Sequence, residues 1–498
     1  MSQRRKIKIF LGVVFLLFFV LPFFRAGAVG RSLSFGLSGS DVTAFQNKLI
    51  KQGYLAEGKA TGYFGPLTQA AVKKFQCDQN IICSGASATT GYGVAGPRTQ
   101  ASLASVSIIP VQPSKINGTS LTGPAIGKFE ISGWMPDWRA ASSTKDVLPH
   151  LNQITSVMPF SYTVSSEGKI SDSAKFAKEP WTSFIAEAKK QKVRVIPSIL
   201  WGDGEAMHKI LSNTKKRIAL EDEIAALVKR YGFDGIDIDF EAKQSRTINY
   251  FSTFLKGLYQ RMGKKWVFCT IEARMPLEDR YSAGAAIPAD ATEYANDYTQ
   301  INKYCDRVEI MAYDQGTIDV RLNAARTAPY APVADPGWVE NIVTLAAQTI
   351  SKNKIIIGVP TYGYEYRVTP LAGSGYQYKM LWPFNPKYAT DIASRLGIAP
   401  SRTSANELGF IYNPDSLAAM AAPSESDFTL TQESMPSTTI AQNAGSQVNI
   451  NQPFNYVTWS DSQAIADKMA LARKLGVRGV AVFNFGGGAD PTIWDALK

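Results

Sequence analysis

Residues that build metal centres are scarce in this sequence. Its 498 residues include two histidines, His150 and His208, and four cysteines, none of them in a Cys-x-x-Cys pair. Zinc sites in proteins combine several histidine and cysteine ligands at short, regular spacings. The sequence therefore predicts no zinc site, and we expect neither a metal nor a cofactor.

No apolar run reaches the roughly 20 residues that a membrane-spanning helix needs. The longest, Ile9–Phe24, is interrupted by Pro22. It follows a basic start and precedes Arg25-Ala-Gly-Ala28, whose small residues fit a cleavage site, so residues 1–28 are predicted to be a signal peptide. An uncleaved anchor is the alternative, and it would be the only expected contact with a membrane. We expect a secreted or cell-wall-associated monomer.

Acidic residues are fewer than basic ones, 42 against 53, for a net charge of +11. Five of the basic residues lie in residues 1–28, so subtracting them from 53 leaves 48 against 42. We find no basic cluster with a matching nucleic-acid motif, and nucleic acid is not an expected partner. The small excess fits an anionic polymer such as a cell wall, or simply solubility.

Cysteines in an exported protein tend to pair. Cys77 and Cys83 flank a short segment inside one small domain, and we predict a disulfide between them. Cys269 and Cys305 lie far apart in the sequence. They could pair only if two neighbouring strands brought them together.

Residues 31–104 have the pattern of a small all-α module. A Gly/Pro turn that enters a helix at Thr61–Ala70 returns at Thr90–Ala101. The segment resembles the peptidoglycan-binding domain of bacterial wall hydrolases, which implies a non-catalytic module that holds its enzyme on the wall. Residues 105–128, rich in Pro, Gly and Ser, are predicted to be a linker. The matching residues are Ser40-Asp41-Val42, Gln46, Gly53-Tyr54-Leu55, Thr61 to Thr68 and Ala71 to Gln76.

From residue 129 onward, short apolar runs alternate with helical patterns. Eight strands separated by helices predict an α/β fold, a (β/α)₈ TIM barrel over residues 129–498. A doubly wound open sheet is the alternative, but no Gly-x-Gly-x-x-Gly follows the first run. The gap of about 115 residues before the eighth run predicts an inserted subdomain or lid at roughly 366–450. The runs are Phe129–Trp134, Ile154–Phe160, Val193–Leu200, Phe233–Phe240, Trp266–Glu272, Arg307–Tyr313, Lys354–Pro360 and Val477–Phe485.

One stretch, Tyr231–Glu241, carries the carboxylates Asp234, Asp237, Asp239 and Glu241. In a β-strand residues two apart share a face, so the last three acids point to one side and apolar residues to the other. Burying unpaired charges is costly, so such a row indicates chemistry or a bound cation. At a barrel's C-terminal face, repulsion and burial would keep one acid protonated, as glycoside cleavage requires. Calcium binding and a salt-bridged structural cluster are the alternatives.

The segment Asp234-Gly-Ile-Asp-Ile-Asp-Phe-Glu241 matches the Asp-x-x-Asp-x-Asp-x-Glu signature of family 18 glycoside hydrolases. Met311-Ala-Tyr-Asp314, Gly358 to Gly363 and Ser460 to Gly479 resemble later segments of the family, in the expected order. The resemblance covers residues 129–498. In detail the chain is most similar to the bacterial branch of spore-cortex and wall N-acetylglucosaminidases.

This resemblance implies a retaining mechanism in which the N-acetyl group of the substrate is the nucleophile. Glu241 would be the general acid and base. Asp239 would orient the acetamido group, with Asp237 holding or sharing its proton. Tyr313 would hydrogen-bond the acetamido carbonyl, and Asp314 would contact the sugar or tune the pocket.

Aromatic rings near strand ends are candidates for stacking on sugars, with core packing as the alternative. Phe483 stands where the family usually has Trp. The Ser-x-Gly-Gly of many chitinases is absent from the third strand, which disfavours a standard chitinase. The candidate substrate-binding residues are Met311, Asp314, Trp134, Trp138, Trp201, Tyr362 and Phe483.

We therefore expect an exported glycosidase that cleaves β-1,4 linkages of an N-acetylglucosamine polymer, with peptidoglycan favoured as the partner. A chitinase acting on chitin oligosaccharides is the first alternative. A carbohydrate-binding, lectin-like inactive barrel is the second. It is disfavoured because Glu241, Asp239 and Tyr313 are all present.

Overall fold

The computed structural model divides into two compact units, Met1–Thr119 and Ser120–Lys498. The predicted signal peptide, residues 106–127 of the predicted linker, and Cys83 lie outside the described residues. Among the residues that are described, no helix is both long and apolar enough to cross a membrane. The structure describes residues 31–56, 58–79, 81–82, 87–105, 128–371, 375–414, 448–486, 490 and 492–498.

The N-terminal unit is the predicted helical module. Val42, Phe45 and Leu49 lie on one side of the first helix, as their spacing of three and four residues requires, and pack with Phe64 and Phe75. Pro66 opens the second helix at its first position, where a missing N–H costs nothing. The helices are α1 (Ser40–Lys51), α2 (Pro66–Asp78), α3 (Ser87–Thr90) and α4 (Pro97–Ser105).

The sequence repeat of this module is also a structural repeat. Gln46 of α1 is buried, and its amide donates to Thr68 Oγ1 of the first copy at 2.8 Å. Gln76 of α2 is buried in the same way and donates to Thr99 Oγ1 of the second copy at 3.0 Å. Each glutamine also bonds to the backbone of its glycine turn, so each helix anchors the turn that follows it.

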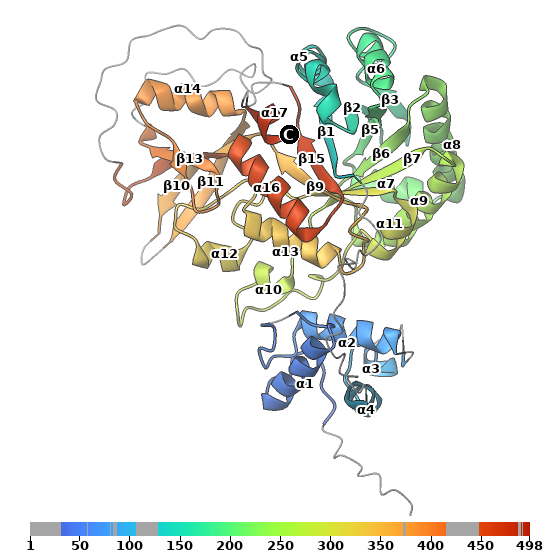
Figure 1. The fold of residues 1–498 in the computed structure, drawn as a ribbon, viewed down its shortest axis with the longest axis vertical. Coiled ribbons are helices and arrows are strands. Elements are labelled where there is room, and N and C mark those ends of the chain that lie inside the picture. Colours follow the sequence, from blue (N-terminus) through green and yellow to red (C-terminus); the bar gives the residue numbers. More distant parts are fainter. Residues whose placement is uncertain are drawn as a thin grey trace, which may run out of the picture. The chain divides into compact units, whose positions relative to one another are not determined.

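In the described part of the C-terminal unit, eight parallel strands form a closed barrel, which confirms the predicted fold (Figure 1). The order around the ring is β1-β15-β9-β8-β7-β6-β5-β2, and pairing of β1 with β2 closes it. Strands covered on both faces are apolar almost throughout, which explains their unbroken runs in the sequence. The strands are β1 (Glu130–Pro136), β2 (Ser156–Val164), β5 (Ser198–Trp201), β6 (Gly235–Phe240), β7 (Trp266–Glu272), β8 (Arg307–Met311), β9 (Ile355–Pro360) and β15 (Gly479–Phe483), with short β3 (Ile170–Asp172) and β4 (Arg194–Val195) pairing with β2.

Helices lie around the barrel strands (Figure 1). The helix before β6, α8 (Thr214–Tyr231), shows how the sequence sets the two ends of a helix. Asn213 caps its start by accepting from Lys216 N, and Gly232 ends it in the left-handed conformation. The helices are α5 (Ala140–Val147), α6 (Trp181–Lys190), α7 (Gly204–Leu211), α8 (Thr214–Tyr231), α9 (Ile248–Met262), α10 (Leu277–Arg280), α11 (Tyr298–Tyr304), α12 (Val320–Ala325), α13 (Pro336–Ala346), α16 (Ser462–Leu475) and α17 (Ile493–Ala496), with 3-10 turns η1 (Asp137–Arg139), η2 (Leu148–Gln153) and η3 (Ser245–Thr247).

The segment between β9 and β15 holds a second, antiparallel sheet, in the order β11-β10-β14-β13-β12 among its described residues. This sheet extends from Gly363 to Trp459, beyond both ends of the predicted insertion at 366–450. The difference arises because β14 pairs along its whole length with β10, which begins three residues after barrel strand β9 ends. The elements are β10 (Gly363–Pro370), β11 (Tyr376–Phe384), α14 (Pro386–Leu396), β12 (Ser401–Arg402), β13 (Leu408–Tyr412) and β14 (Phe454–Trp459).

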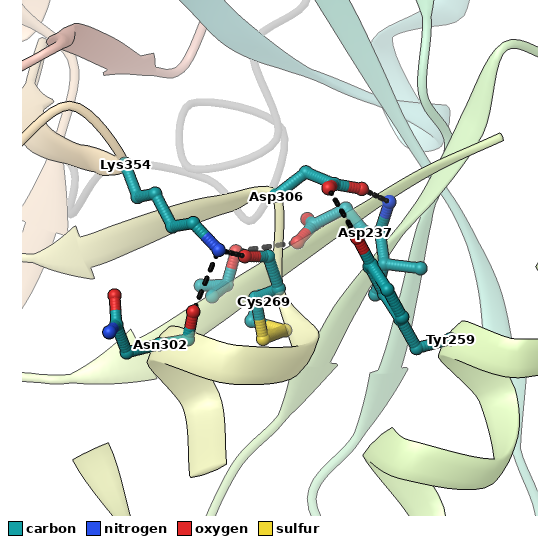
Figure 2. The surroundings of a disulfide bond; sticks show 9 residues. Asp237, Tyr259, Cys269, Asn302, Asp306 and Lys354 are labelled. Carbon is teal, nitrogen blue, oxygen red and sulfur yellow. Dashed lines mark hydrogen bonds between the residues drawn. A yellow bond between two sulfur atoms is a disulfide. The ribbon is translucent and has the colours of Figure 1, made fainter. Parts of the chain in front are cut away.

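A disulfide joins Cys269 of β7 to Cys305, which lies two residues before β8 (Figure 2). The two strands are neighbours, which is the condition that the sequence set for this pair. Around it, Lys354 Nζ donates to the carbonyl of Cys305 at 2.9 Å, and Tyr259 donates to Asp306 at 3.2 Å. The cross-link therefore lies in a tightly bonded part of the barrel wall.

Candidate active site

The row of acids lies on the inner face of β6. Asp237 and Asp239 are 0% and 3% exposed, and they pair in register with Ser198 and Leu200 of β5. The alternate residues of β6 belong to the core between strands and helices, where Phe240 stacks on Phe254 of α9. The predicted alternation is thus the observed one. Asp234 stands apart from the row and accepts a hydrogen bond from Val195 N.

Asp237 is surrounded by neutral hydrogen-bond donors. Ser198 Oγ donates to it at 2.6 Å, Thr270 Oγ1 at 2.8 Å and Trp134 Nε1 at 3.2 Å. Burial raises the pKa of Asp237, and these hydrogen bonds, led by that of Ser198, oppose the rise. Three donors from three different strands therefore fix the orientation of this carboxyl group.

Asp239 lacks this support. Its Oδ1 is buried, and no hydrogen-bond partner reaches it from the described residues. Burial, followed by repulsion from Asp237 and Glu241, raises the pKa of Asp239 well above its usual value. An unpartnered, buried carboxyl oxygen is costly unless something binds it, so Asp239 is prepared to bond a ligand.

Glu241 follows the last residue of β6, and its backbone N–H donates to the carbonyl of Trp201 at 2.9 Å. It lies at the C-terminal end of its strand, where barrel active sites are found. Burial raises the pKa of Glu241, and the negative charge of Glu272 raises it further. The side chain can therefore keep a proton and give it up at the barrel mouth.

Tyr313 and Asp314 follow β8 on the same rim. The Tyr313 ring stacks on Phe483 with 5.5 Å between centroids, and burial raises the pKa of Tyr313 well above its usual value. Asp314 has a left-handed backbone, with φ of 63°, and accepts hydrogen bonds from Tyr362 and Tyr364. Burial also raises the pKa of Tyr362 well above its usual value.

Phe483 is the centre of an aromatic cluster at this rim. Its ring lies 5.7 Å from that of Trp134 and 6.1 Å from that of Tyr362. Met311 ends β8 and is partly buried. Trp138, just after β1, is 54% exposed and packs edge-on against Phe160. Trp134 links this cluster to the acids, because its Nε1 donates to Asp237.

Trp201 lies elsewhere, and its predicted sugar contact is not supported. Its side chain is 1% exposed and packs edge-on against Phe240, in the layer between strands and helices. The reason is the register of β5, which pairs Trp201 with Phe240 and so turns both to the outside. Trp201 is a core residue of the barrel.

Several residues of the site escaped the sequence interpretation. Lys243 and Glu272 form an ion pair beside Glu241, with Nζ and Oε2 3.1 Å apart. Glu309 of β8 is fully buried inside the barrel, where Ser132 donates to it at 3.1 Å. Burial raises the pKa of Glu309 well above its usual value. The sequence does contain a signal for all three residues. Each is a charged residue in or beside an apolar strand, and each lies two positions from another residue that faces the inside of the barrel.

Among the described residues, no group of His, Cys, Asp and Glu side chains has an arrangement that could hold a metal ion. A closed parallel barrel with carboxylates along the inner face of one strand, up to its C-terminal end, is an architecture that TIM-barrel glycosidases share. Residues 130–488 match the model of glycosyl hydrolases family 18, and the chain belongs to that family. Residues 38–103 match the model of a peptidoglycan binding domain.

Three similar proteins illustrate the relationship. The chain is 27% identical over 194 residues to the uncharacterized glycosylase YvbX of Bacillus subtilis (strain 168), a match covering 38% of this chain and 52% of YvbX. It is 25% identical over 299 residues to the probable chitinase 2 of Drosophila melanogaster, covering 57% of this chain and 54% of that protein. The chain thus spans about half the length of the curated relatives it matches. The spore cortex-lytic enzyme SleL of Bacillus megaterium QM B1551 shares the fold, with a TM-score of 0.53 at 19% identity over 74% of this chain and 73% of SleL.

Proposed function

We propose that this protein is an exported β-N-acetylglucosaminidase that cleaves β-1,4 linkages of peptidoglycan. The observation that carries the proposal is the inward row of Asp237, Asp239 and Glu241, which leads to the barrel mouth in a chain that also has a peptidoglycan-binding module. The predicted signal peptide supports a location outside the cell or on its wall. We expect the enzyme to work as a monomer.

The chemistry proceeds in two steps. Glu241 donates its proton to the glycosidic oxygen as the bond from that oxygen to the anomeric carbon breaks. The carbonyl oxygen of the substrate's own acetamido group attacks the anomeric carbon and forms an oxazolinium ion. In the second step Glu241 takes a proton from water, and the water oxygen attacks the anomeric carbon. The bond between this carbon and the acetamido oxygen breaks, which opens the oxazolinium ring with net retention of configuration.

The buried acids support this chemistry through their surroundings. The unpartnered oxygen of Asp239 can accept a hydrogen bond from the acetamido N–H of the substrate. When Asp239 is ionised, its negative charge stabilises the positive charge that develops on the oxazolinium ring. Asp237 lies one layer deeper on the same face, where it can hold the proton that Asp239 releases. Tyr313 would bond the acetamido carbonyl through its hydroxyl, and the stacking of its ring on Phe483 supports this role.

Peptidoglycan is favoured as substrate because of the module at residues 38–103 and because SleL is named as a spore cortex-lytic enzyme. Chitin is the second candidate because a relative is named as a probable chitinase. Both polymers contain the acetamido sugar that the mechanism requires. An assay of cleavage on both polymers therefore decides between them.

The test is to incubate the wild type and Glu241→Gln with peptidoglycan and with chitin oligosaccharides, and to identify the new chain ends by mass spectrometry. We expect cleavage of peptidoglycan with N-acetylglucosamine at the new reducing end, and a loss of at least about 100-fold in the variant. Cleavage of chitin alone would make the protein a chitinase. Binding without cleavage by the wild type would indicate a lectin-like barrel, and an active variant would remove Glu241 from its role.

A further inference from the structure

An ion pair flanks the acid on the side of β7. Lys243 lies two residues after Glu241, and its side chain has no exposed surface. Its Nζ lies 3.1 Å from Glu272 Oε2, donates to the carbonyl of Phe240, and stands 5.2 Å from the ring centroid of Phe251. The lysine is therefore confined beside the catalytic strand rather than reaching into solvent.

Glu272 is the last residue of β7, the neighbour of β6 in the barrel. Its side chain is 40% exposed, and Asn296 Nδ2 donates to the same Oε2 at 2.7 Å. Asn296 is itself buried, so it is a second fixed donor to this carboxylate besides Lys243. Both ends of the ion pair are thus held in place by other groups.

The two charges act on Glu241 in opposite directions. After burial, the carboxylate of Glu272 raises the pKa of Glu241, whereas the ammonium of Lys243 lowers it. Asp239 on the same strand hydrogen-bonds Glu241 and lowers its pKa, the charge of Asp314 after β8 raises it, and Tyr313 is a titratable phenol on that side. Among the groups named here, all of them described residues, Lys243 is the cation, and the others are carboxylates and one phenol.

We propose that Lys243 and Glu272 are positioning residues for Glu241, and that their ion pair sets the upper pH limit of hydrolysis. The proposal rests on Glu241 being the general acid. A fully buried lysine is expensive, and an ion pair made for stability alone gains little over apolar packing. The location of this ion pair beside Glu241 suggests a role in catalysis. The fixed anion strengthens the binding of the Glu241 proton, and the fixed cation weakens it, so together they set how strongly the proton is held.

The test compares pH profiles of kcat/KM for one soluble oligosaccharide that the wild type cleaves. Activity needs protonated Glu241, so the rate falls as pH rises through its pKa. Glu272→Gln removes the anion and should move this limb to lower pH. Lys243→Met removes the cation and should move it to higher pH, each by roughly one pH unit. The double variant should return close to the wild-type profile.

Glu340→Gln is the matched control, since Glu340 is 38% exposed and pairs with Lys474 at 3.0 Å between helices α13 and α16. It should leave the profile unchanged. Glu272 is partly exposed, so Glu272→Gln decides the case even if Lys243→Met fails to fold. An ion pair that only stabilised the fold would lower the melting temperature in each single variant without moving the limb in opposite directions.

Two failures remain distinguishable. If the wild type is active and Glu241→Gln is not, but Glu272→Gln keeps the wild-type limb or both single variants shift it the same way, the positioning role is wrong and the proposed function stands. If Glu241→Gln is as active as the wild type, the proposed function fails and the positioning role falls with it.

Discussion

Removal of the disulfide between Cys269 and Cys305 should lower the free energy of unfolding of the barrel by about 4 kcal/mol. The bond closes a loop with a sequence separation of 36 residues. In the chain-entropy account, the loss of loop freedom in the unfolded chain grows with the logarithm of loop length, and a loop of this size gives about 4 kcal/mol at 25 °C. The double variant Cys269→Ala/Cys305→Ala makes the change.

Packing adds a second contribution that the assay has to separate. Both cysteines are 0% exposed, so replacing them with alanine also leaves small voids, each costing on the order of 1 kcal/mol. Wild-type protein unfolded in the presence of a strong thiol reductant loses the cross-link but keeps the sulfur atoms. Urea unfolding followed by circular dichroism, with and without reductant, then gives the two contributions one at a time, provided that every protein compared carries Cys77→Ser and Cys83→Ser so that Cys269–Cys305 is the bond being reduced.

We expect the reduced wild type to lose most of the 4 kcal/mol and the alanine variant to lose slightly more. A reduced wild type within about 1 kcal/mol of the oxidised protein would refute the loop-closure reasoning. In that case a loss confined to the alanine variant would assign the stability to packing of the two sulfur atoms against the core.

The acids and the module give two further predictions. Asp239→Asn should abolish hydrolysis and raise the melting temperature at pH 7, because burial and neighbouring charges raise the pKa of Asp239 and make its charged form unfavourable in the folded state. By the same reasoning, the wild type should gain stability as pH falls through that raised pKa and lose it as pH rises. The variant should show a smaller dependence, because the raised pKa values of Asp237, Glu241 and Glu309 remain. A variant less stable than the wild type at pH 7 would contradict the reasoning. Residues 31–105 have a hydrophobic core of their own, so they can be deleted without cutting into the barrel. The deletion should abolish sedimentation with insoluble peptidoglycan and leave hydrolysis of soluble oligosaccharides unchanged. Equal sedimentation of the two proteins would show that the module does not hold the enzyme on its polymer.

Patterns that depend on near neighbours in the chain could be predicted from the sequence. The alternation of acids and apolar residues in β6 is local, because the backbone of any strand turns successive side chains to opposite faces. The barrel followed from runs and helical patterns in alternation, and the helical module from the spacing of Val42, Phe45 and Leu49. The family signature around Glu241 lies within this local information.

Contacts between strands could not be predicted in the same way. Trp201 ends a strand near the site, and its sequence context resembles that of a subsite residue. Its direction depends on the pairing of β5 with β6, which sets it opposite Phe240 and away from the barrel mouth. The extent of the insertion was likewise hidden, because β10 and β14 pair across a long separation in the chain.

The sequence by itself determined which acids share a face, how many strands the barrel has and that a small helical module precedes the barrel. The tertiary structure alone decided the cross-link at Cys269, the ion pair of Lys243 with Glu272, and the tyrosines that bond Asp314. The physical reason is barrel closure. Ring order and stagger bring the ends of β6, β7 and β8 together, and no local pattern in the chain records that stagger.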